Sequence, residues 1–87
     1  MLFRSDLYNE AIAQGEQGNH VAAARLYAEI IRINPQAAYA YYDLGLTFKN
    51  DLNDRNASVK CFRSAAILYR QQGEDSMARE SLSQIGN

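Results

Sequence analysis

The chain has 87 residues, which is enough for one domain and too few for two. Apolar residues make up 47% of it and the net charge is −1, so the composition is that of a globular protein, not of a disordered chain or a nucleic-acid binder. A single cysteine excludes an internal disulfide and a cysteine-based zinc site, and the apolar runs are too short to span a bilayer.

Catalytic and cofactor-binding patterns are absent from the sequence. His20, the one histidine, has no histidine or cysteine nearby in sequence, and no phosphate-binding glycine loop occurs. The acidic residues form no isolated pair in apolar context, which acid–base catalysis would need. We therefore expect no enzyme, no metal or other cofactor, no nucleic-acid partner and no membrane insertion. The lone cysteine, Cys61, fits a reducing cytoplasm and is expected to be buried.

Turn-forming residues divide the chain into five segments, each with the apolar period of a helix. The predicted helices span residues 2–14, 20–33, 36–49, 54–72 and 74–86. Between the second and third segments, we expect Asn34 to cap the third helix and Pro35 to occupy its first position.

Each predicted helix has one apolar stripe, in which small and large side chains alternate. In chain order the stripes are Phe3, Leu7 and Ala11; Ala23, Tyr27 and Ile30; Tyr41, Leu44, Gly45 and Phe48; Cys61, Phe62, Ala65, Leu68 and Tyr69; and Ala78, Leu82 and Ile85. Small residues facing large ones allow close packing of helix pairs. We expect two helix backbones nearly to touch at Gly45.

The stripes recur along the chain. Leu7–Ala11 aligns with Tyr41–Gly45 at an offset of 34 residues, and Leu82–Gly86 resembles the second block again. The run from Gly18-Asn19 through Ala23, Tyr27 and Ile30 to Asn34-Pro35 resembles the second helix of a tetratricopeptide repeat. The run of Tyr41, Leu44-Gly45 and Phe48 resembles the first helix of such a repeat.

This resemblance implies an all-α fold in which five helices form antiparallel pairs, stacked as a short right-handed solenoid. The single domain 1–87 would comprise repeat 1 (about 2–35), repeat 2 (about 36–72) and a capping helix (about 74–86). Met77, Ala78, Leu82 and Ile85 of the capping helix are expected to cover the helix before it. The alternative is that the chain is a piece of a longer array.

A second set of side chains recurs opposite the core stripes. Tyr8 and Tyr42 are 34 residues apart, as are Asn9 and Asp43. In the resembled family this face lines a concave groove that holds an extended peptide. The predicted groove residues are Tyr8, Asn9, Ile12, Tyr39, Tyr42, Asp43, Leu46 and Lys49. Because the tyrosines and aliphatic residues among them lie opposite the core, we expect the removal of these side chains to spare the fold.

The resemblance implies a protein-interaction adaptor whose partner is a protein or a peptide segment. Chaperone-tail binders of the family clamp a carboxylate with basic and amide groups. Tyr8, Ile12 and Asp43 stand at those positions here, so such a tail is not expected. Glu16 and Asp43 accompany Lys49, so no strong charge preference is predicted.

Two further interpretations remain open. The tyrosine stripe would alternatively mediate a homodimer. Lys60, Arg63 and Arg70 share one side of the fourth helix, as a solvated face or as an anion-binding stripe.

Overall fold

The computed structural model describes residues 4–86, and within them the chain forms five helices and no strand. The helices are α1 (Arg4–Glu16), α2 (His20–Ile33), α3 (Ala38–Asn50), α4 (Arg55–Gln71) and α5 (Asp75–Ile85). The predicted all-α class and the number of helices are confirmed. Phe3 and the first residues of repeat 1 lie outside the described residues.

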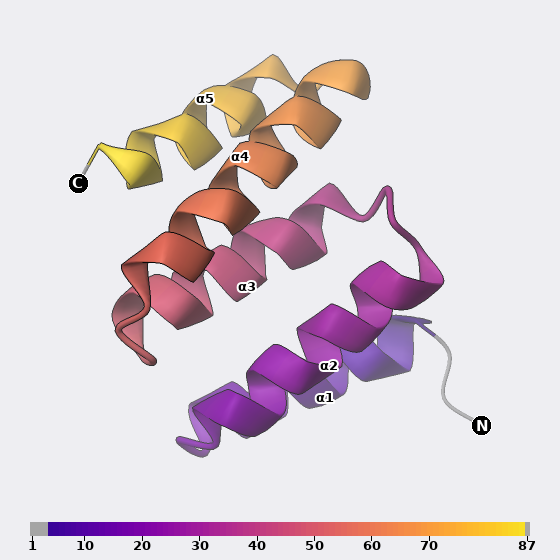
Figure 1. The fold of residues 1–87 in the computed structure, drawn as a ribbon. Helices are drawn as coiled ribbons and strands as arrows, with labels where there is room; N and C mark the ends of the chain where they lie inside the picture. Colours follow the sequence, from indigo (N-terminus) through magenta and orange to yellow (C-terminus); the bar gives the residue numbers. More distant parts are fainter. Residues whose placement is uncertain (1–3, 87) are drawn as a thin grey trace.

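Each helix packs against the next one along the chain, from α1 on α2 to α4 on α5. Figure 1 shows α2 and α4 in front of α1 and α3, so the first four helices alternate between two layers. Consecutive packing in layers is the architecture of a helical-repeat solenoid, here a short one that measures 32 × 27 × 17 Å.

The core combines small and large side chains as the sequence predicts. Ala11 and Ala23 are buried beside Tyr27 and Ile30, where α1 meets α2. On α4, Phe62 is fully buried. Alanine at the contact points lets the helix axes approach closely, and the aromatic rings fill the space that remains.

The turn between α2 and α3 differs from the prediction. Ala37, not Asn34, is the N-cap of α3, and Asn34 is the C-cap of α2. The Asn34 carbonyl accepts a hydrogen bond from the Ala37 backbone N–H at 3.0 Å, and its side chain accepts one from the Gln36 N–H at 3.2 Å. Pro35 therefore occupies the second position of a tight turn, which suits its fixed φ.

Helix α5 packs on α4 as expected, and its buried residues include one that the sequence did not predict, Ser81. Ala78 and Ser81 are fully buried, whereas Leu82 is 43% exposed and lies at a groove beside α4. A serine is small enough for close approach of the two helices. Its hydroxyl donates to the Met77 carbonyl at 2.8 Å, so its burial leaves no unpaired polar group.

Gly45 makes the close approach that the repeat pattern predicts, although its neighbour is an aromatic ring and not a helix backbone. A methyl group added at its Cα would lie 2.8–3.0 Å from three atoms of the Phe62 ring. That ring is fully buried and meets the Tyr42 ring edge-on, with ring centroids 5.7 Å apart. Phe62 therefore has no space into which it can move.

We expect Gly45→Ala to lower the free energy of unfolding by about 1–3 kcal/mol, because the added methyl group overpacks the contact with Phe62. Gly15→Ala, inside α1, is the matched control. Its added methyl group would lie 3.9 Å from the Ala23 Cβ, an ordinary contact. There the gain in helix propensity should raise stability by about 0.5–1 kcal/mol. Urea unfolding followed by circular dichroism measures both variants, and a stabilising Gly45→Ala would contradict the packing described.

Candidate functional site

An open groove of about 380 Å³ runs between α1, the start of α2 and α3. Three predicted groove residues line it: Ile12, Asp43 and Leu46. The remaining lining residues are Ala11, Gly15, Glu16, His20, Ala23, Tyr27, Thr47, Asn50 and Asp51. Buried alanines and Tyr27 make an apolar floor, and the polar residues of the helix ends make the rim.

A hydrogen bond between Tyr8 and Asp43 joins α1 to α3 beside this groove. The Tyr8 hydroxyl donates to Asp43 Oδ2 at 2.6 Å. The Tyr8 ring meets the Tyr39 ring edge-on at 5.1 Å and lies 6.1 Å from the Tyr27 ring. Burial, together with the neighbouring Asp43, raises the pKa of Tyr8 above its ordinary value, and burial raises the pKa of Tyr27 to about 12. Tyr8 is thus bonded to Asp43, which lines the groove, but it is not itself a lining residue.

Asp43 is the groove's one half-buried carboxylate. Burial raises its pKa, and the hydrogen bond from Tyr8 offsets this only in part. A carboxylate that is poorly solvated gains most from an approaching cation, because the cation replaces the hydration that burial has removed. Asp43 is therefore suited to hold a basic group of a ligand.

Two other predicted residues of α3 face α5. The Tyr42 hydroxyl donates to Glu80 Oε2 at 3.2 Å and accepts from Gln84 Nε2 at 3.4 Å. Lys49 Nζ donates to the backbone and side-chain carbonyl oxygens of Gln84, at 3.0 Å each. Neither Lys49 nor Tyr42 lines the groove between α1 and α3.

The eight predicted groove residues differ in their exposure to solvent. Asn9, Ile12 and Tyr39 are exposed, and the other five are half-buried. Tyr8 and Tyr42 make contacts between helices, so their truncation would remove interhelical packing. The expectation that both tyrosines are dispensable for the fold is corrected accordingly.

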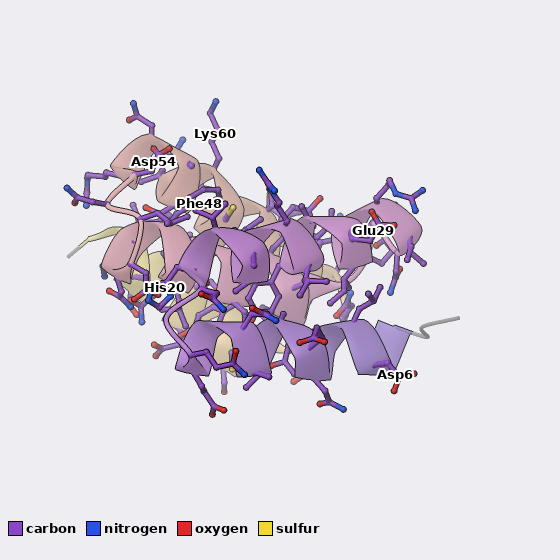
Figure 2. The ribbon with its side chains drawn as sticks, turned by 90° about the horizontal axis from the view of Figure 1, so that it is seen from below. Asp6, His20, Glu29, Phe48, Asp54 and Lys60 are labelled. Atoms are coloured by element: carbon purple, nitrogen blue, oxygen red, sulfur yellow. The ribbon has the colours of Figure 1, made fainter. Side chains whose placement is uncertain are left out.

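One end of the groove contains two residues that helical periodicity missed. His20 begins α2 and Asp51 follows α3, and His20 Nδ1 lies 3.5 Å from Asp51 Oδ2. Figure 2 shows His20 at the end of the molecule opposite Asp6 and Glu29. Both His20 and Asp51 stand at helix ends, where an apolar period carries no information. The sequence did contain one signal for this pair. The turn before α2 and the turn after α3 are separated by about one repeat length.

The groove is acidic. Glu16, Asp43 and Asp51 line it, and His20, the one basic lining residue, is already beside Asp51. Lys49, which the sequence places as a counter-charge, is held by Gln84 instead. The groove lining therefore carries more acidic than basic side chains, whereas the sequence predicted no strong charge preference for the partner.

Residues 4–86 offer little other chemistry. No three or more histidine, cysteine or acidic side chains gather there in a way that could hold a metal ion. No helix among these residues has the length and apolar character needed to cross a membrane. Cys61 is buried as predicted, and burial raises the pKa of its thiol to about 11, so the folded protein holds it in an unreactive state.

Part of the chain matches a known protein family. Residues 7–37, which hold most of α1 and all of α2, match the tetratricopeptide repeat family. No curated protein matches the chain. The matched stretch includes Ile12, Glu16 and His20, so it carries the α1–α2 side of the groove.

Asp43→Asn tests the cost of burying this charge. The pKa of Asp43 is raised in the folded state. Below its unfolded-state pKa of about 4, burial of this side chain therefore does not lower the free energy of unfolding. It destabilises the fold as the pH rises from there through the folded-state pKa. Asparagine is neutral and still accepts from Tyr8, so we expect it to raise the melting temperature at neutral pH but not at about pH 3.

Scanning calorimetry at both pH values measures the effect. Glu16→Gln is the control, because it removes an exposed groove carboxylate and should change stability by less than about 0.5 kcal/mol. A lower melting temperature for Asp43→Asn at neutral pH would show that the charge is well compensated.

Proposed function

Because the chain is a small repeat protein of the tetratricopeptide family, we propose that it is an interaction module that binds an extended, basic segment of a partner protein in the α1–α3 groove. The family is a non-catalytic repeat scaffold that typically binds proteins. The acidic, apolar-floored groove is the single observation that carries the finer assignment.

The groove offers separate places for an apolar and a basic side chain. Ile12, which is 37% exposed, and the half-buried Leu46 face the groove from α1 and α3. A leucine, isoleucine or aromatic side chain of the partner would bury their remaining apolar surface. Asn50 on the rim carries an amide that can bond the backbone of an extended segment.

The carboxylates determine the preferred charge. A lysine or arginine beside the anchoring apolar residue would reach Asp43, whose partial burial strengthens a charge-assisted hydrogen bond. Exposed Glu16 would add a weaker, salt-sensitive attraction. A groove built from so few helices supports an affinity on the order of 10 μM for a single segment.

The remaining assignments follow the same reasoning. We place the protein in a reducing compartment such as the cytoplasm, in keeping with its single buried thiol. We assign it no catalytic activity. Symmetric dimerisation through the exposed Ile12 and Tyr39 is the alternative use of this face, and sedimentation at several protein concentrations distinguishes it from peptide binding.

The proposal predicts which peptides the protein selects. From a displayed library of random peptides of about nine residues, we expect enrichment of lysine or arginine next to a large apolar residue. Titration calorimetry on one selected peptide should show at least tenfold weaker binding by Ile12→Ser and by Asp43→Asn. Val21→Ser is the matched control, because Val21 is an exposed apolar residue of α2 outside the groove.

Three results would count against this function. Selected peptides with a net negative charge would contradict the acidic groove. Binding that Ile12→Ser leaves unchanged would put the site elsewhere. A concentration-dependent dimer that Ile12→Ser abolishes would favour self-association.

A further inference from the structure

A second groove lies between α4 and α5 and has a volume of about 350 Å³. Its lining residues are Arg63, Ala66, Ile67, Arg70, Gln71 and Leu82. Ile67 is 57% exposed and Leu82 43%, so two large aliphatic side chains face solvent across one groove. It shares no residue with the α1–α3 groove.

The charge of this groove is opposite to that of the first. Arg63 and Arg70 are its charged lining residues, and no carboxylate lines it. The ion pairs found among residues 4–86 join His20 to Asp51 and Arg32 to Glu29, so neither groove arginine has its charge paired within the described part of the chain. Two unpaired guanidinium groups beside exposed aliphatic residues would complement a ligand that is both apolar and acidic.

We propose that the α4–α5 groove binds an amphipathic helix of a partner protein, whose apolar stripe is flanked by aspartate or glutamate. Arg63 and Arg70 are seven residues apart on α4, which corresponds to roughly 10 Å along the helix axis. Ile67 lies between them in sequence, so an apolar side chain is placed between two positive charges. A partner helix that follows α4 would carry its carboxylates at the same seven-residue interval.

The polarity of the lining favours a helix over an extended segment. Apart from the two arginines, Gln71 is the only lining residue with a polar side chain. An extended segment would place backbone N–H and C=O groups over Ala66, Ile67 and Leu82 without partners. A helix satisfies its own backbone and brings only side chains to the groove, as in other helix-in-groove interfaces.

The test uses two synthetic helical peptides of about 18 residues with the same leucine stripe. The acidic probe carries glutamates seven residues apart on both sides of the stripe, and the control probe carries lysines there. By fluorescence anisotropy at low salt, we expect the acidic probe to bind at least fivefold more tightly than the lysine probe. The difference should shrink as salt screens the charges.

Substitutions test whether the acidic probe binds in the α4–α5 groove. Arg70→Glu and Ile67→Ser, both at exposed positions, should each weaken the acidic probe at least fivefold while circular dichroism stays unchanged. Arg25→Glu, the same charge change at an exposed position of α2, should have little effect. Asp43→Asn and Ile12→Ser should also leave this binding intact, which separates its outcome from that of the α1–α3 groove.

Each of the other outcomes overturns the proposal. Equal affinity for the two probes would mean that the arginines play no part. If the acidic probe does not bind, the groove does not take a helix of this kind. A dimer in ultracentrifugation that Ile67→Ser abolishes would assign the groove to a second copy of the chain.

Discussion

The contact between Gly45 and Phe62 sets the distance between α3 and α4, and the rest of the stack follows from that distance. Phe62 is fully buried, and its ring also supports Tyr42, which reaches Glu80 and Gln84 on α5. One glycine thus allows an aromatic ring to connect three consecutive helices. A side chain at that position would separate α3 from α4 and disturb the hydrogen bonds that hold α5.

Tyrosines have a corresponding role between α1 and α3 and between α3 and α5. Tyr8 reaches from α1 to Asp43 on α3, in the same way that Tyr42 reaches from α3 to the acidic Glu80 on α5. The two tyrosines occupy equivalent positions of the repeat, so the stack uses one device twice. Asp43, the acceptor of the Tyr8 hydrogen bond, is half-buried and lines a groove. It is therefore accessible to a ligand as well as joining two helices.

Helical periodicity predicted the elements of the fold because the apolar stripes are long and regular. It could not predict the α2–α3 turn, since Asn34 followed by Pro35 is compatible both with ending one helix and with starting the next. It also did not predict that Ser81 is buried, because hydrophobicity alone does not report how closely two helices approach. Helix separation is a property of the assembled stack.

The candidate groove was predictable in part for a similar reason. The 34-residue offset identifies Ile12 and Leu46 as equivalent positions, and both line the groove. The direction of Lys49 depends on where Gln84 of α5 lies, which no local pattern encodes. His20 and Asp51 come together only because two turns meet at one end of the stack.

The small residues between α4 and α5 affect how the molecule opens. Only Ala78 and Ser81 of α5 are buried, whereas α4 buries six of its residues. Much of what holds α5 in place is therefore polar, including Lys49 to Gln84 and Arg55 to the Ile85 carbonyl. Elements with few buried apolar groups open at low free energy, without unfolding the whole domain. The backbone amides of α5 should therefore exchange their hydrogens with solvent before those of α2 and α4.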